Sequence, residues 1–139
     1  LDQASIIVDT TIAKGRELGF EPITVVVLDA GGHYVAMKRD DESSLLRPQI
    51  AHGKAWGALG MGLPGRKLRE RAQANPSFFA ALSDLCGGNM VANPGGVLLR
   101  DAKGKIIGAV GASGDTGDND EICIIAGIEA AGLIADAGL

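Results

Sequence analysis

The fold is decided by residues 93–133, which read NPGGVLLRDAKGKIIGAVGASGDTGDNDEICIIAGIEAAGL. Two apolar runs, 97–100 and 105–112, flank a turn that contains glycine, which is the pattern of an antiparallel hairpin. A polar, glycine-rich loop follows over 113–120, and the apolar residues of 122–137 then crowd most faces of a helix. The rest of the chain must pack around this unit of two strands and a buried helix.

The N-terminal part predicts a helix followed by a second hairpin. Apolar residues recur at helical spacing over 1–18, and Gly19 stands where a helix C-cap is expected. The β-branched run 23–28 predicts a strand that is buried on both faces. A turn with two glycines leads from there into 33–39, which we expect to return as the partner strand.

Two or three helices are expected between the two hairpins. Residues 50–61 are rich in alanine and glycine, with Pro48 suited to the first turn of that helix. A short basic helix over 66–74 and a restarted helix over 78–85 follow. No alternation of strand and helix of the parallel type appears. The predicted class is therefore α+β, a single domain over 1–139 with an antiparallel sheet and helices on its faces.

The composition and net charge of the chain argue against some classes of binding partner. The chain has 139 residues, a net charge of −4 and no apolar run near the ~20 residues of a membrane span. Neither a nucleic-acid surface nor an anionic membrane surface is expected, because both call for a basic patch. Cys86 and Cys123 lack metal-site spacing, and free thiols indicate a reducing cytoplasm. The chain begins at Leu1 instead of Met, so secretion after removal of a signal peptide is the alternative location.

Five short motifs occur in a recognisable order along the chain. They are VVVLDAGGH (25–33), IAHGKA (50–55), PGGV (94–97), IGAVGASG (107–114) and DNDE (118–121). In this order they resemble the GlcG/HbpS-like family, also called the haem-degrading domain family, which includes the C-terminal domain of PduO-type proteins. The resemblance extends over essentially the whole chain.

The resemblance implies a profilin-like α-β-α sandwich and a homo-oligomer, as a dimer, tetramer or octamer. It also implies haem as a cofactor, with haem sensing, storage or degradation as the role. Two departures from the family pattern are visible. Leu98 stands where many members have proline, and 1–18 contains no histidine, although some haem-binding members use a first-helix histidine as the axial ligand.

Two histidines are candidate haem ligands. His33 follows the glycine turn at the start of a strand, where it would ligate iron, act as a general base, or simply be a solvated turn residue. His52 lies on the alanine-rich helix, as an axial ligand at a subunit interface or as a partly exposed surface residue. The sequence leaves both alternatives open.

Lys54 is the most unusual charged residue, because it lies among the small residues of a tightly packed helix. A lysine in that place must pair with a carboxylate, extend to solvent or point into a pocket. The expected acidic partners are Asp29 and Glu121. Binding of an anionic ligand group is the functional alternative to an ordinary ion pair.

Several small residues are candidates for lining a ligand site. The amides of Gly95 and Gly96 would form a small anion nest or belong to a plain turn. Gly111 lies within a strand, which indicates the close approach of either a ligand or another backbone. Ser113 and Thr116 are expected to cap the last helix and to face a pocket. No cluster with the spacing of metal ligands is present.

Two main functions follow from these residues. The first is haem or tetrapyrrole binding. The second is an enzyme or sensor for a small organic acid, in which Lys54 and the two glycine amides bind the carboxylate while His33 or Asp29 transfers a proton. A structural partner of other proteins is a third alternative. The expected ligand-binding residues are Lys54, Gly95, Gly96, Gly111, Ser113 and Glu121.

Overall fold

Five strands form one antiparallel sheet in the order β2-β1-β4-β3-β5 in the computed structural model, which describes residues 1–139. The strands are β1 (Thr24–Asp29), β2 (Tyr34–Arg39), β3 (Gly96–Arg100), β4 (Ile106–Ser113) and β5 (Ile134–Asp136). The two predicted hairpins are confirmed as β1–β2 and β3–β4, and β1 joins them by pairing with β4. All pairs are antiparallel, so the predicted sheet type is confirmed.

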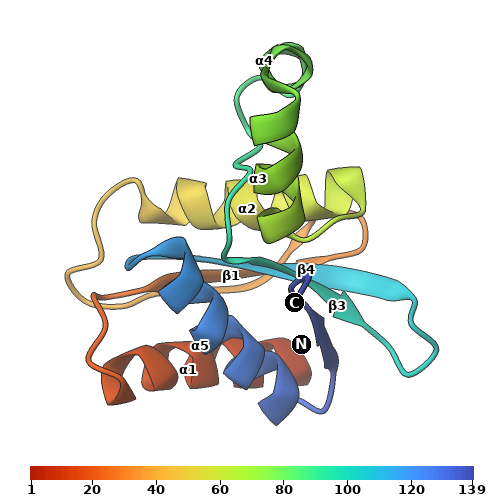
Figure 1. Ribbon diagram of the computed structural model, residues 1–139. Coiled ribbons are helices and arrows are strands. Elements are labelled where there is room, and N and C mark those ends of the chain that lie inside the picture. The colour runs from red at the N-terminus through yellow and green to blue at the C-terminus, as the bar shows by residue number, and fades with distance from the viewer.

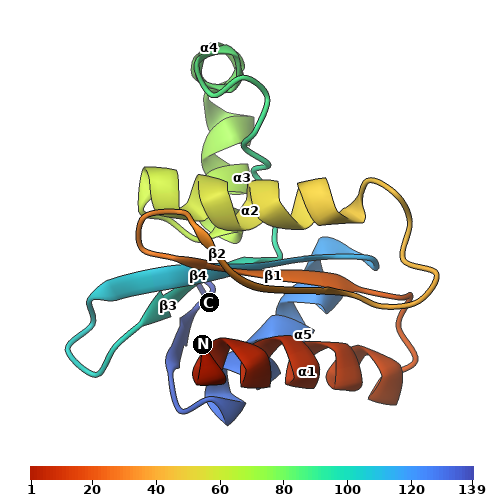
Figure 2. The same cartoon turned by 180° about the vertical axis from the view of Figure 1, so that it is seen from behind.

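Helices cover both faces of the sheet, as expected for an α-β-α arrangement. Two helices lie under one face and one lies over the other, while a pair projects away from the body (Figures 1 and 2). They are α1 (Asp2–Glu17) and α5 (Gly117–Ala130) on the first face, α2 (Arg47–Met61) on the second, and α3 (Gly65–Ala74) and α4 (Pro76–Leu85) in the projection. None of these helices is long and apolar enough to cross a membrane.

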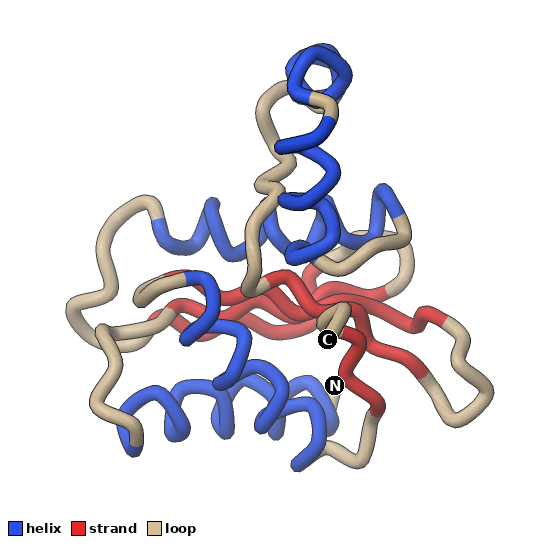
Figure 3. The backbone as a smooth tube through the Cα atoms, viewed as in Figure 1, coloured by secondary structure: helices blue, strands red, loops and turns tan.

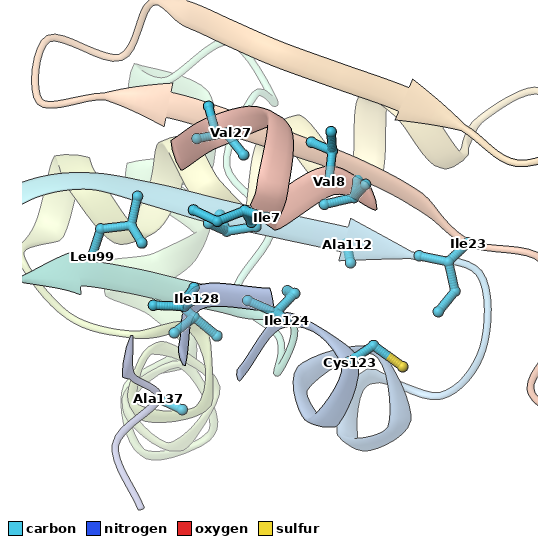
Figure 4. Packing of buried hydrophobic residues seen from close by; sticks show 14 residues of the cluster. Ile7, Val8, Ile23, Val27, Leu99, Ala112, Cys123, Ile124, Ile128 and Ala137 are labelled. Carbon is cyan, nitrogen blue, oxygen red and sulfur yellow. The ribbon is translucent and has the colours of Figure 1, made fainter. Parts of the chain in front are cut away.

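Alternate residues of β1 enter two separate cores. Val25 and Val27 belong to the larger cluster, between the sheet and the α1–α5 layer (Figure 4). Val26 and Leu28 belong to the smaller cluster on the α2 side. Side chains of a strand point alternately to opposite faces. The continuous β-branched run therefore fills both cores, and the predicted burial of this strand on both faces is confirmed.

Close contact between α2 and the sheet depends on small residues on both sides. Ala51 and Ala55 are fully buried, and a Cβ atom placed on Gly111 of β4 would lie 1.8 Å from the carbonyl oxygen of Ala51. Of the two reasons considered for a glycine in this strand, the structure shows the approach of another backbone. Any side chain at position 111 would force α2 away from the sheet.

The predicted helix over 122–137 is wrong at its C-terminal end. The helix stops at Ala130, and Gly132 adopts the left-handed conformation with φ of 75°. A glycine in that conformation ends a helix without a steric penalty. The apolar residues beyond it form β5, which pairs with β3 at the edge of the sheet, and Ala137 enters the larger core.

Candidate functional site

A cleft of about 610 Å³ opens between α2, the start of β2 and the segment that leads from α4 to β3. This volume lies within the roughly 300–1,000 Å³ of typical small-molecule sites. Four of the nine lining residues are hydrophobic, and none carries a formal charge. The lining residues are Tyr34, Leu46, Pro48, Gln49, Ile50, His52, Gly88, Asn89 and Val91.

Two stacked rings lie in this cleft. The ring centroids of Tyr34 and His52 are 5.0 Å apart, with an angle of 23° between the ring planes. Tyr34 pairs with Leu28 in the β1–β2 ladder and so projects toward the face that α2 covers. His52 reaches the same place from α2. The stack therefore joins β2 to α2 at the cleft, with the imidazole in contact with the tyrosine ring.

The environment of His52 favours its neutral form. Partial burial lowers the pKa of the His52 imidazole, because a charged ring loses hydration there. A neutral imidazole keeps a nitrogen lone pair that is free to bind a metal ion. The lowered pKa therefore favours the form of His52 that is chemically able to ligate a metal ion.

His33 lies outside the cleft, in the turn between β1 and β2. Its side chain is 81% exposed, and its Nδ1 atom lies 3.2 Å from Oδ1 of Asp29. The same Asp29 oxygen accepts the backbone N–H groups of His33 and Gly31, and the bond from the His33 backbone is the main cause of a lowered Asp29 pKa. A carboxylate with a lowered pKa is a poor proton acceptor near pH 7. These contacts organise a hairpin turn.

Lys54 is engaged by the protein itself. Its Nζ atom donates to the carbonyl oxygen of Ala112, at 2.9 Å, and to Oδ2 of Asp120, at 3.3 Å. The expected acidic partners were Asp29 and Glu121, whereas the structure places Asp120 next to the amine. The contacts link α2 to β4 and to α5 in the interior, where the Lys54 and Asp120 side chains are 4% and 0% exposed.

Desolvation is the dominant influence on this buried pair. It lowers the pKa of Lys54, and the attraction to Asp120 offsets only part of that effect. It also raises the pKa of Asp120, against the opposing attraction to Lys54. For both groups, the free-energy cost of desolvating the charge exceeds the stabilisation that comes from their mutual attraction.

Gly95 and Gly96 pack directly against Lys54. A Cβ atom on Gly95, whose φ is +100°, would lie 2.9 Å from the Lys54 amine, and one on Gly96 would lie 2.5 Å from the Lys54 carbonyl oxygen. The glycines thus allow β3 to begin against α2. Neither glycine nor Lys54 lines the 610 Å³ cleft. The arrangement fits a structural role for Lys54 better than the capture of a substrate carboxylate.

Ser113 and Thr116 act within the loop between β4 and α5. Ser113 is fully buried, and its Oγ atom accepts a hydrogen bond of 3.1 Å from Nη1 of Arg47. The side chain of Thr116 accepts the backbone N–H of Asn119 and caps α5, so the predicted capping by Thr116 is confirmed. Neither side chain lines the cleft.

Glu121 is buried beside α3. Its Oε1 atom accepts a hydrogen bond of 3.0 Å from Nη2 of Arg66, while Oε2 is buried and has no partner within the chain. Arg66 also pairs with Asp118 on the outer side of α5. This contact joins the base of α3 to the N-terminal turn of α5, and Glu121 lies apart from the cleft.

Sequence reasoning missed Tyr34 and most of the other cleft residues. Tyr34 is the only tyrosine of the chain, and it follows His33 at the start of an expected strand. Strand alternation was the available signal, since it places Tyr34 on the face that the His52 helix covers. The segment that contains Asn89 and Val91 has no periodic pattern to place it. No group of three or more His, Cys, Asp or Glu side chains is arranged to hold a metal ion.

The fold and the cleft define an α-β-α protein with a ligand-sized cleft beside the edge strand β2. The chain belongs to the family described as haem degrading protein HbpS-like, whose model matches residues 1–129. It is similar to an uncharacterized 15.0 kDa protein of the dhaT–dhaS intergenic region in Citrobacter freundii, with 29% identity over 110 residues, or 79% of this chain and 75% of that protein. It is also 29% identical over 99 residues to the corrinoid adenosyltransferase PduO of Salmonella typhimurium, covering 71% of this chain and 29% of PduO.

Solved structures share the fold at low sequence identity. The PduOC:heme complex superimposes with a TM-score of 0.88 at 23% identity, over 98% of this chain and 96% of that one. The Klebsiella pneumoniae protein ORFY gives a TM-score of 0.84 at 22% identity, with coverage of 94% and 88%. HbpS gives 0.79 at 23% identity, with coverage of 92% and 86%. These likenesses establish the α+β fold.

Proposed function

We propose that this protein binds haem in the 610 Å³ cleft, with His52 as the axial ligand to iron. The observation that carries this proposal is the placement of a neutral imidazole, held by the Tyr34 ring, in a partly apolar cleft. Histidine is a common axial ligand of haem iron. Bound there, the group would supply redox and oxygen chemistry of its own.

The residues present fit the parts of a haem group. Apolar side chains such as Leu46, Ile50 and Val91 suit the porphyrin faces, and Gly88 leaves one wall free of side chain. The carboxylates of haem are stabilised by a nearby cation, and the cleft lining itself supplies none. Arg39 lines the neighbouring hollow, which shares Pro48 and Gln49 with the cleft. We assign Arg39 as the cation for these carboxylates.

Membership of a family named for haem degradation supports the proposal, as does a similar structure described as a haem complex. Haem binding is the step that sensing, storage and degradation have in common. The organic-acid alternative needs a free Lys54 amine, and that amine already has two partners within the protein. The chain's own contacts therefore favour the haem proposal.

We further infer a homo-oligomer in a reducing compartment. Both cysteines are free, which is the state that the cytoplasm maintains. Exposed large hydrophobic side chains, among them Leu45 at 85% and Leu85 at 83%, supply surface for contacts between subunits.

A haem titration followed by absorbance tests the proposal. The unmodified protein should give a saturating Soret band with a stoichiometry of one haem per chain. His52→Ala should abolish the spectrum of histidine-ligated iron and weaken binding by about tenfold or more, since an axial bond is lost. Circular dichroism should show that the variant keeps its fold, because the His52 side chain is partly exposed.

His33→Ala is the matched control, because it removes the only other histidine. It should leave both the spectrum and the affinity unchanged. An unchanged Soret band in His52→Ala would contradict the assignment of the ligand. Non-saturating binding by the unmodified protein would contradict the proposed function itself.

A further inference from the structure

The projecting helices form an arm, defined here as residues 65–86, whose outer half buries nothing within the chain. The ten-residue helix α4 has no buried residue, and it stands away from the sheet at the tip of the projection (Figure 3). Phe78, Leu82 and Leu85 repeat at helical spacing, and Phe78 and Leu85 are 57% and 83% exposed. A helix of this length is only marginally stable in water by itself. Its apolar face requires a cover.

The charge of the arm is opposite to that of the remaining chain. The arm contains four basic and two acidic residues, a net charge of +2. Because the whole chain has a net charge of −4, the remainder has −6. The ion pairs of α3 engage Arg66 and Lys67, which leaves Arg69 and Arg71 unpaired. Two arms would repel each other, whereas an arm and a body attract.

The turn between β2 and α2 has a surface that could complement the basic and apolar side chains of the arm. This turn, residues 40–46, presents acidic side chains first and then two leucines. Asp41 and Glu42 are exposed, and Leu45 and Leu46 are 85% and 63% exposed. Asp40 is paired with Arg16, so Asp41 and Glu42 are the two carboxylates of the turn without an ion-pair partner. These two carboxylates complement the unpaired arginines of α3, and the neighbouring leucines complement the apolar face of α4.

We propose that the arm of one copy of this chain docks on the 40–46 turn of a second copy. Arg69 and Arg71 would face Asp41 and Glu42, and α4 would cover the exposed leucines. The cleft lies between this turn and the segment that returns from the arm to β3, since Leu46 of the turn and Asn89 of that segment both line it. In a dimer with a twofold axis, each arm would dock on the turn of the other copy, so that both surfaces would be covered at once.

The docked arm also reaches the cleft of the partner. Leu46 belongs to the 40–46 turn and to the cleft lining at the same time. An α4 helix placed on that leucine closes the open side of the cleft with apolar side chains. This part of the inference rests on the proposed haem function, while the docking itself does not.

The mass of the haem-free protein, measured by light scattering after gel filtration, tests the docking. The unmodified chain should run as a multiple of the 14.2 kDa subunit. Arg69→Glu with Arg71→Glu should reduce that mass at least by half, and Asp41→Lys with Glu42→Lys should do the same. The two pairs combined should restore it, because the attraction is re-formed with reversed signs.

Lys103→Glu with Lys105→Glu is the matched control, with the same change of charge at the exposed β3–β4 turn. It should keep the mass of the unmodified protein. A monomeric unmodified chain, an unchanged mass in the arm variant, or a combined variant that fails to reassemble would each overturn the docking.

Haem titration of the same variants tests the closure of the cleft. The arm variant should bind haem about tenfold more weakly than the unmodified protein, and the combined variant should recover. Full affinity in a dissociated variant would overturn the closure. Absence of haem binding by the unmodified protein would overturn the proposed function, whereas the docking would still stand or fall by the measured masses.

Discussion

The Tyr34–His52 stack combines two effects on one side chain. Contact with the tyrosine ring, at a centroid distance of 5.0 Å, restricts the rotamers of the imidazole before any ligand arrives. Less side-chain entropy is then lost on binding. Partial burial at the same time lowers the His52 pKa, so that the ring is neutral over a wider pH range. Both effects favour ligation of iron at neutral and mildly acidic pH.

Haem binding should therefore resist acidification. Protons compete with iron for the imidazole only below the pKa of the free ring, and the His52 pKa is shifted downward by desolvation. The Soret band should decline below the pH of about 6.5 at which an unperturbed histidine titrates. Absorbance titrations from mildly alkaline to acidic pH measure this midpoint. A midpoint at or above this pH of about 6.5 would contradict the role given to burial.

The Lys54–Asp120 pair connects three secondary-structure elements at one buried point. Lys54 comes from α2, its carbonyl acceptor Ala112 from β4, and Asp120 from α5. Asp120 also accepts the backbone N–H of Asp115 through its other oxygen. Each polar atom has a partner, so removal of one member leaves the other buried and uncompensated.

Lys54→Met should destabilise the protein by about 3–5 kcal/mol, because Asp120 would remain in the interior without its counter-charge. Adding Asp120→Asn should recover much of the loss, since the amide oxygen still accepts the Asp115 N–H and the charge is gone. Urea unfolding followed by circular dichroism measures both free energies.

Lys14→Met provides the comparison for that experiment, since Lys14 pairs with Glu17 on the surface of α1. Its effect should stay within about 1 kcal/mol, as is usual for exposed ion pairs. A Lys54→Met variant as stable as Lys14→Met would show that the buried pair is dispensable.

In the whole molecule, the sheet separates two apolar layers of unequal size. The larger cluster has 14 buried residues between the sheet and α1 and α5, while the smaller has 7 on the α2 side. Cys123 of α5 is fully buried in the larger layer. Desolvation raises the pKa of its thiol to about 11. The thiol therefore reports on the opening of that layer.

Cys123 should be inert toward alkylating reagents in the native protein at mildly alkaline pH. The reactive thiolate is scarce under that condition, and reagents reach it only when α5 leaves the sheet. Its modification rate, followed by mass spectrometry, should rise with urea in parallel with global unfolding. Cys86, which is half-buried at the end of α4, serves as the internal reference. Equal rates for both cysteines without urea would contradict this description of the core.

Local patterns predict the elements well where a single periodicity applies. The run 23–28 predicts a doubly buried strand, and the alanines of 50–61 predict a helix in close contact, since both patterns depend only on neighbouring residues. The pattern fails after Ala130, where apolar residues beyond Gly132 suit a helix and a strand equally well. Pairing with β3 decides between them.

By itself, the sequence determined the two hairpins, the α+β class, the family resemblance and His52 as a candidate ligand. Tertiary structure alone decided that Asp120 pairs with Lys54, that His33 lies outside the cleft, and that Tyr34 stacks on His52. The physical reason is the range of the interactions. Turns, caps and periodic burial depend on interactions between residues that are close in the chain. The cleft, in contrast, forms only where β2, α2 and the segment between α4 and β3 meet in space.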